Sequence, residues 1–310
     1  MSTETLTPAP ARVRRGRAPR SRTAGPSAWM SAPALAIFGV FAILPLLGVF
    51  ILSFVSWDGL GDMTMAGLSN WTSTLSNPVT HNALRLTAIV TVVTWLIQTP
   101  LALLLGVFMA GKQKYRALLS VLYFLPLLFS AAAVAVAFQA LLNPHFGMGS
   151  ALGLDFLSKD WLGRPDLALF VVLFVIAWIF VPFHSLLYQA GVRQIPQSMY
   201  EAATLDGAGR VRQFFSITLP QLKYTIITSS TLMIVGSLTY FDLIFVLTGG
   251  GPAGATRILP LDMYLTGFRA HDMGGAAVSG VILVTIGLTV AVVLNRVSGA
   301  YKMESQMDGV

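Results

Sequence analysis

Residues Tyr200–Pro220 read YEAATLDGAGRVRQFFSITLP and form a polar segment in an otherwise apolar chain. The segment carries two acidic residues, Glu201 and Asp206, and two basic residues, Arg210 and Arg212. On each side lies an apolar run long enough to cross a bilayer as a helix, which takes about 20 residues. The charged segment is therefore expected to lie outside the membrane, between two spans.

The sequence predicts two short helices within this segment. Ser198 and Glu201 have the spacing of a capping box, in which a hydroxyl and a carboxylate satisfy the first amides of a helix. Gly207 is expected to end that helix in the left-handed conformation that glycine tolerates. A second amphipathic helix follows, and Leu219-Pro220 is expected to break the chain before the next span. Physical reasoning alone leaves two roles open, a helical loop on the membrane surface and a docking element for a cytoplasmic partner.

Composition places the whole chain in the membrane class. Of its 310 residues, 55% are hydrophobic and 11% are charged, whereas soluble domains carry about 25% charged residues. The chain has no cysteine, which excludes disulfides, thiolate catalysis and cysteine-bound metals. Its four histidines are too scattered to suggest a metal site. The fold class predicted is all-α, a polytopic membrane protein.

Six apolar runs are long enough to be transmembrane helices. They cover roughly residues 33–57, 82–110, 117–142, 167–191, 224–248 and 274–296. Prolines within several of these runs are compatible with helices packed in a membrane bundle.

The basic residues predict the orientation of these spans. When the N-terminus is placed inside, fifteen of the twenty Lys and Arg residues fall in cytoplasmic segments. The net charge of +7 thus reflects topology, and no nucleic acid partner is expected. Both termini are predicted to be cytoplasmic, with a disordered basic tail over residues 1–28, the spans within 29–298 and a second tail over 299–310. The twin arginines Arg14-Arg15 resemble an export signal, but the apolar run that follows is too long for a signal peptide.

The polar segment closely resembles the EAA signature of ATP-binding-cassette (ABC) importer permeases. The matching residues are Glu201, Ala202 and Ala203, then Gly207, Ile217 and the pair Leu219-Pro220, at the spacing of the signature. Asp206-Gly207-Ala208 resembles the carbohydrate-type branch, and Thr248–Pro252 (TGGGP) resembles one half of the maltose-type and glycerol-phosphate-type permease pair. The resemblance covers about residues 30–298.

This resemblance implies a type I importer architecture with a coupling loop at residues 193–222. Glu201 would make the polar contact with an ATPase subunit, Ala202 and Ala203 would pack closely against it, and Gly207 would form the turn. The implied partners are a second homologous permease, two cytoplasmic ABC ATPases, an extracytoplasmic solute-binding protein, a sugar and membrane lipid. ATP and Mg²⁺ would be bound by the ATPases and no cofactor by this chain, in the plasma membrane of a prokaryote.

A near match to a phosphate-binding loop occurs at Gly106–Gln113. The sequence has Gln113 where that motif needs a hydroxyl for magnesium, and its glycines close a membrane span. No nucleophile and base form a recognisable pair, so the chain is not expected to be an enzyme.

Candidate residues for the substrate pathway lie in the fourth and fifth runs, because transporter sites lie near the membrane midplane between helices. In the fifth run they are Ser237, Tyr240 and Asp242, the last being the only acid within a predicted span. In the fourth run they are Trp178 and Phe183 as aromatic walls, while His184 is expected to be a packing residue. Each also has a structural interpretation, as helix packing or as an interfacial carboxylate.

Four other functions were weighed against a sugar importer. A secondary carrier usually needs several ionisable groups in the membrane, and an ion channel needs a filter sequence or a ring of charge. A membrane enzyme has no visible catalytic pair. Glycerol phosphate or another polyol is the alternative substrate of an ABC permease, but the predicted spans lack the cluster of basic residues that a phosphate would favour.

Overall fold

The computed structural model describes residues 28–111 and 113–298, and about 76% of these described residues are helical. The predicted tails over 1–28 and 299–310 lie outside the described residues, apart from Ala28. The chain forms two compact units that meet between Leu46 and Leu47. The first unit contains a 3₁₀ turn at Ala28–Ser31, α1 at Ala32–Phe38, a π-helical turn at Gly39–Ile43 and the start of α2 at Leu44–Leu52.

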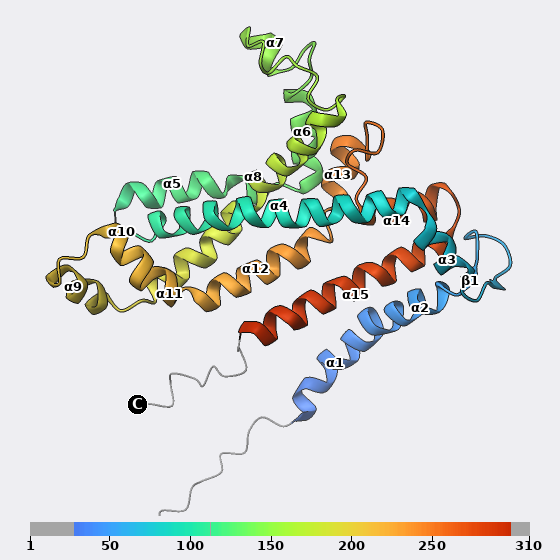
Figure 1. The fold of residues 1–310 in the computed structure, drawn as a ribbon, viewed down its shortest axis with the longest axis horizontal. Helices are drawn as coiled ribbons and strands as arrows, with labels where there is room; N and C mark the ends of the chain where they lie inside the picture. The colour runs from blue at the N-terminus through green and yellow to red at the C-terminus, as the bar shows by residue number, and fades with distance from the viewer. Residues whose placement is uncertain (1–27, 112, 299–310) are drawn as a thin grey trace, which may run out of the picture. The chain divides into compact units, whose positions relative to one another are not determined.

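Long helices dominate the second unit. The longest are α4 (Pro78–Met109), α8 (Pro165–Arg193) and α15 (Met273–Ser298), and α4 and α8 each begin with a proline, whose fixed φ suits a first turn. Asn77 caps α4 by accepting a hydrogen bond from the Val79 amide. Figure 1 shows these helices running lengthwise together with α12 (Lys223–Ser237). Within the described residues, four helices, counting the one over Trp29–Leu52, are long and apolar enough to cross a membrane.

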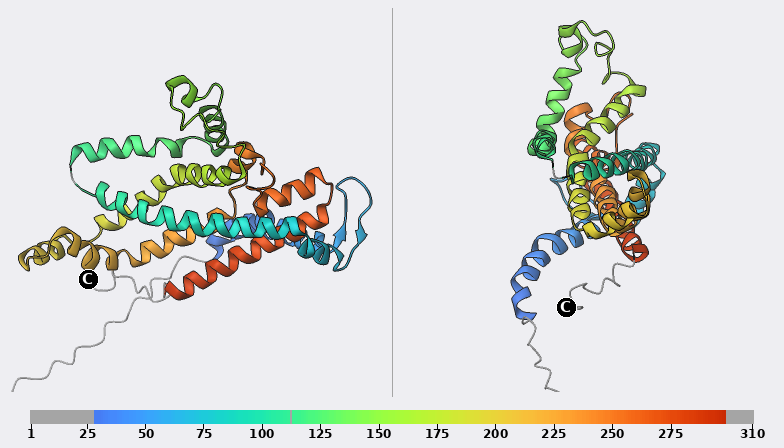
Figure 2. Two further views of the ribbon diagram at one scale, coloured as in Figure 1. Left: turned by 45° about the horizontal axis from the view of Figure 1, so that its top comes forward. Right: turned by 90° about the vertical axis from the view of Figure 1, so that its left-hand side faces the viewer.

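The predicted third and fifth spans are each broken in two. α5 (Lys114–Phe124) and a 3₁₀ turn (Leu125–Leu128) meet α6 (Ala131–Leu141) at 96°, and α12 meets α13 (Phe241–Thr248) at 48°. If each bent pair is one span, the total reaches the six that the sequence predicts. The first bend follows Pro126, after which Phe129 and Ser130 are extended and Ser130 caps α6. α6 consequently projects away from the long helices and carries α7 (Met148–Leu152) at its far end (Figures 1 and 2).

The core of this unit forms where small residues let helices approach. A Cβ atom at Gly106 of α4 would lie 2.7 Å from the Ser185 carbonyl oxygen of α8, so only glycine fits there. The amide of Gln189 on α8 donates to the carbonyl of Met109 at 2.9 Å. Gly106 lies within the continuous helix α4, which agrees with the prediction that this stretch is no phosphate-binding loop.

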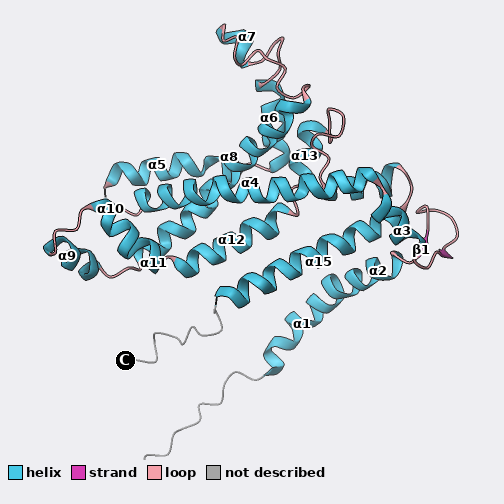
Figure 3. Cartoon of the chain, viewed as in Figure 1, coloured by secondary structure: helices cyan, strands magenta, loops and turns pink. Residues whose placement is uncertain are grey.

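Short elements close the end of the unit where α4 begins. They are β1 (Val55–Ser56) and β2 (Thr64–Met65), which pair antiparallel, and α3 (Ser69–Ser76), α14 (Leu259–Tyr264) and a π-helical turn at Leu265–Arg269. This small ladder is the only sheet in the part of the chain that the structure describes (Figure 3). The buried carboxylate of Asp262 accepts from Arg257 at 2.7 Å and from Thr80 of α4 at 3.3 Å, which fixes α14 against α4.

Candidate functional site

The segment over residues 193–222, predicted to be a coupling loop and called the coupling loop below, contains the helix α9 at Gln197–Leu205. Gly207 follows with φ of +75° and the Ala208 amide donates to the Ala203 carbonyl at 2.8 Å, which closes the helix in a Schellman motif. A Cβ atom at Gly207 would meet nothing within 4 Å. The backbone conformation, rather than lack of space, therefore requires glycine there, which confirms the predicted helix end.

The predicted capping box is wrong. α9 starts at Gln197, its N-cap is Pro196, and no side chain caps it. Ser198 is therefore already inside the first helical turn, where its hydroxyl cannot serve as the cap. The carboxylate of Glu201 is exposed and forms no ion pair within the described residues.

The second half of the coupling loop is one nearly continuous helical path. It runs through α10 (Arg210–Gln213), a π-helical turn (Phe214–Thr218) and α11 (Leu219–Gln221). Pro220 does not break the chain as predicted, because it falls in the first turn of α11, where its missing amide removes little hydrogen bonding. The helical path is instead interrupted at Leu222, whose ψ is 0°.

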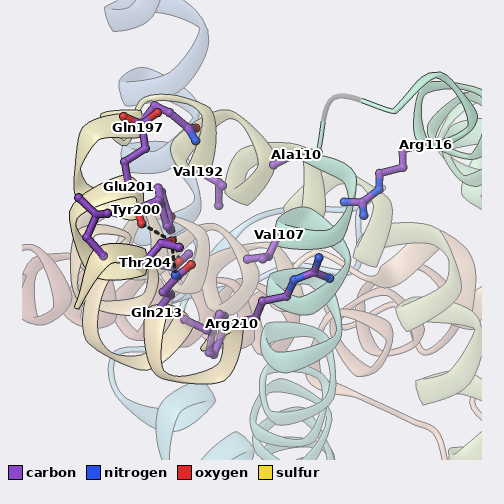
Figure 4. A pocket seen from close by; sticks show the side chains of 14 residues that line it. Val107, Ala110, Arg116, Val192, Gln197, Tyr200, Glu201, Thr204, Arg210 and Gln213 are labelled. Atoms are coloured by element: carbon purple, nitrogen blue, oxygen red, sulfur yellow. Dashed lines mark hydrogen bonds between the residues drawn. The ribbon is translucent and has the colours of Figure 1, made fainter. Parts of the chain in front are cut away.

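Three hydrogen bonds tie the two halves of the coupling loop together. The Tyr200 hydroxyl pairs with that of Thr218 at 2.9 Å. The Gln213 amide donates to Thr204 at 3.1 Å and to the Ala208 carbonyl at 2.8 Å, as Figure 4 shows for Thr204. Because the bonds of Tyr200 and Thr204 cross the Gly207 turn, the two halves form one folded unit, and the bond to Ala208 holds the start of the second half.

This unit stands at the end of the long helices, beside a cavity of about 750 Å³. The cavity is bounded by Val107 and Ala110 of α4, Val192 of α8 and Glu201 of α9 (Figure 4). On the loop's surface the candidates Glu201, Ala202, Asp206, Gly207 and Pro220 are exposed, whereas Ala203, Ile217 and Leu219 are partly buried.

Sequence reasoning missed the exposed apolar side chains of this loop. Leu205 is 90% exposed, Val211 72% and Phe215 60%. Three large apolar groups on one short polar loop suggest contact with another protein. The signal was present in the sequence, since Leu205 lies four residues after Glu201 and so on the same face of α9.

A second cavity, of about 390 Å³, lies between the two bent helix pairs. Leu127 and Ala131 line it from the first bend, and Thr239, Tyr240 and Asp242 from the second, while Phe180, Phe183 and His184 line it from α8. The ring of Tyr240 stacks on Phe180 at 5.2 Å. Asp242 is exposed, lies in the first turn of α13 and is the only carboxylate in the lining, which contains no Lys or Arg.

The structure thus brings together three of the five pathway candidates, Phe183, Tyr240 and Asp242, and places the other two elsewhere. Ser237 is 1% exposed, and its hydroxyl pairs with that of Thr91 on α4 at 2.6 Å. Trp178 packs edge-on against Phe138 at 5.4 Å and lines a separate apolar groove. His184 is 3% exposed and pairs with Ser229 at 3.0 Å, as expected of a packing histidine, although it also lines the cavity.

Residues 98–300 match the model of one protein family, the binding-protein-dependent transport system inner membrane component. The chain belongs to this family. The matched range contains the coupling loop and both bent helix pairs, and the family is a component of membrane transport systems rather than an enzyme. Among the described residues no group of His, Cys, Asp or Glu is placed to hold a metal ion.

Curated relatives of this permease cover most of its length. The probable ABC transporter permease protein YurN of Bacillus subtilis is 32% identical over 84% of this chain and 91% of its own length. The trehalose/maltose transport system permease protein MalF of Thermococcus litoralis is 32% identical over 86% and 89%, respectively. The arabinooligosaccharides transport system permease protein AraP of B. subtilis is 30% identical over 88% of both chains.

A solved structure shows the same fold. It is a crystal structure of a bacterial ABC transporter that imports the acidic polysaccharide alginate. One of its chains matches this permease with a TM-score of 0.76 at 22% identity, over 88% of this chain and 95% of that one. The predicted permease fold is confirmed by this match and by the family.

Proposed function

We propose that this permease is the membrane-spanning subunit of an ABC importer for a neutral mono- or oligosaccharide. The coupling loop carries the proposal, because it is a folded, hydrogen-bonded unit that exposes Glu201 and Leu205 at the end of the long helices. Two separate ATPase subunits, which bind ATP and Mg²⁺, would grip this loop. Their closure would then rock the membrane helices between two states, as in other rigid-body switches.

The cavity between the bends is the proposed sugar pathway. Non-helical backbone at membrane depth is tolerated only where protein buries it or where it lines a water-filled cavity. Leu127 and Ala131, on either side of the first corner, and Thr239 and Tyr240 of the second break line this cavity, which favours a hydrated path over a lipid-facing surface. Phe183 and the stacked Tyr240 provide aromatic faces, and Thr239 provides a hydroxyl, which suit a sugar ring.

The charge of the cavity lining favours a neutral sugar over a phosphorylated one. Asp242 is the only charged side chain in the lining and would repel an anion. Several relatives carry names of neutral sugars, such as trehalose/maltose and arabinooligosaccharides, which agrees with this choice.

The proposed assembly also includes a second, homologous permease and an extracytoplasmic solute-binding protein. A related alginate transporter has been crystallised in complex with its periplasmic protein. Both termini and the coupling loop would face the cytoplasm, with the six spans within residues 29–298 in the plasma membrane of a prokaryote.

The test is mild detergent purification of the tagged chain from native membranes, followed by mass spectrometry of the proteins that copurify. We expect an ATPase with an intact phosphate-binding loop and a second multi-span protein, in a complex whose ATP hydrolysis a neutral sugar stimulates. Recovery of this chain alone or as a self-dimer, in repeated preparations, would argue for a secondary carrier instead.

A further inference from the structure

A third and smaller pocket, of about 140 Å³, lies at the end of the second unit opposite the coupling loop. Its lining comes from α3, the start of α4, the π-helical turn after α14 and the start of α15. Five of its seven lining residues carry a hydroxyl group, and the other two are Asn77 and Asp272. Every lining side chain therefore offers an oxygen atom, and none is basic or apolar.

Two of these hydroxyl groups are buried without a partner. Thr74 is 8% exposed and Ser279 is 1% exposed, and neither side chain makes a hydrogen bond with any residue that the structure describes. Among the described residues, only Gln98 and Tyr188 have side-chain polar atoms that lack both a hydrogen-bond partner and contact with solvent. The hydroxyls of Thr74 and Ser279 thus retain contact with open space, and the pocket they line provides it.

The charge of the pocket is negative. Asp272 caps α15 by accepting from the Gly275 amide at 2.8 Å through one carboxylate oxygen, so its other oxygen is available. The neighbouring carboxylate of Asp262, linked through Thr80, is already neutralised by Arg257. The lining therefore carries one carboxylate, that of the exposed Asp272, among neutral oxygen atoms and no basic residue, which favours a small cation over an anion.

We propose that this pocket binds a hard monovalent cation, Na⁺, through side-chain oxygen atoms of α3, α4, the π-helical turn and α15. Hard cations favour hydroxyl, amide and carboxylate oxygen ligands over nitrogen or sulfur. Thr74, Ser279 and Asp272 supply such oxygens from α3, from α15 and from the residue before α15. The bound ion thus joins segments that lie some 200 residues apart in the sequence and fastens this end of the helix bundle.

The test measures thermal stability of the tagged chain within its native complex, solubilised in mild detergent. Samples in NaCl and in choline chloride at equal ionic strength are heated, and the soluble chain is quantified by immunoblot. Because a ligand that binds only the folded state raises its melting temperature, we expect an increase of about 2–4 °C in NaCl that saturates with concentration.

Variants then assign the effect to the pocket. Ser279→Ala and Asp272→Asn should each abolish the NaCl-specific increase, while Asn can still cap α15 and preserve its start. In choline chloride Ser279→Ala should be no less stable than the wild type, because it removes an unpaired hydroxyl. The control is Ser76→Ala, which changes an exposed hydroxyl of α3 that bonds only to the Ser73 carbonyl and does not line the pocket.

Equal melting temperatures in the two salts would show that the pocket holds only water and would overturn the proposal. A NaCl effect that survives in both pocket variants would overturn it as well, because the ion would then act elsewhere. Neither result bears on the importer function, which rests on the opposite end of the molecule.

Discussion

At the scale of single residues, the coupling loop contains two nearby glycines, Gly207 and Gly209, and only Gly207 has a backbone conformation that requires glycine. Gly207 has φ of +75°, whereas Gly209 has φ of −68°, and a Cβ atom at either would meet nothing within 4 Å. Gly207→Ala should therefore strain the turn by about 1–2 kcal/mol, while Gly209→Ala leaves an ordinary backbone conformation. We expect Gly207→Ala to lower sugar-stimulated ATP hydrolysis of the purified complex several-fold and Gly209→Ala to leave it near wild type. Equal activities would show that the turn geometry is not needed for coupling.

Leu205 lies in the coupling loop but is not one of the residues of the EAA signature. Because its side chain is 90% exposed, replacing it cannot disturb packing within the chain. If Leu205 fills a pocket on the ATPase, Leu205→Ser should reduce copurification of the ATPase at least tenfold at unchanged membrane levels, since burying a leucine is worth about 1.5–3 kcal/mol. Leu205→Met, which keeps an apolar side chain of similar size, is the matched control. Wild-type recovery with Leu205→Ser would exclude this contact.

At the scale of helices, the breaks of the third and fifth predicted spans were the least predictable features of the fold. An apolar run such as residues 117–142 has the length and composition of a straight span, and Pro126 alone does not distinguish a tolerated kink from a bend of 96°. The corner depends on the extended conformations of Phe129 and Ser130, both of which are exposed, and the apolar pattern of the run does not indicate these conformations. By contrast, α4, α8 and α15 follow from their apolar length, and the Gly207 turn from local backbone chemistry.

Ser130 gives a test of the first break. Its hydroxyl accepts a hydrogen bond from the Ala133 amide at 3.2 Å and so caps α6 just after the corner. Ser130→Ala should lower the free energy of unfolding by about 1 kcal/mol, and Ser130→Asp, which can still cap, should retain it. Heating of the solubilised complex with detection of the chain by immunoblot measures both variants. A Ser130→Ala variant as stable as the wild type would mean that packing alone fixes the corner.

Some parts of the candidate site could be predicted from the sequence, and others could not. The helix end at Gly207 was predicted correctly because glycine tolerates the left-handed conformation found there, whereas the coupling role of this polar segment stays a prediction. Among the pathway candidates, Ser237 and Tyr240 share a helical spacing, yet the break at Leu238–Tyr240 separates them. Ser237 then pairs with Thr91, while Tyr240 turns to the cavity. The helical period of 3.6 residues per turn predicts which side chains share a face only within one continuous helix, so it fails across a break.

At the scale of the whole molecule, the absence of cysteine from all 310 residues permits a direct test of topology. Single cysteines can be introduced at Ser198 in the coupling loop and at Asp62 between β1 and β2, both of which are exposed. With a membrane-impermeant maleimide on intact spheroplasts, we expect Asp62→Cys to be labelled at once and Ser198→Cys only after permeabilisation. The reverse pattern would overturn the orientation that the distribution of basic residues predicts.

The close contact at Gly106 bears on how α8 would move in the proposed transport mechanism. α8 has 29 residues and so extends roughly 43 Å at about 1.5 Å per residue, and it leads directly into the coupling loop. No side chain separates α8 from α4 at Gly106, so the two helices are in close backbone contact there. In the proposed transport mechanism, a displacement of the coupling loop would therefore move α8 and α4 together, and with them Phe180 and Phe183, which form one wall of the cavity between the bends.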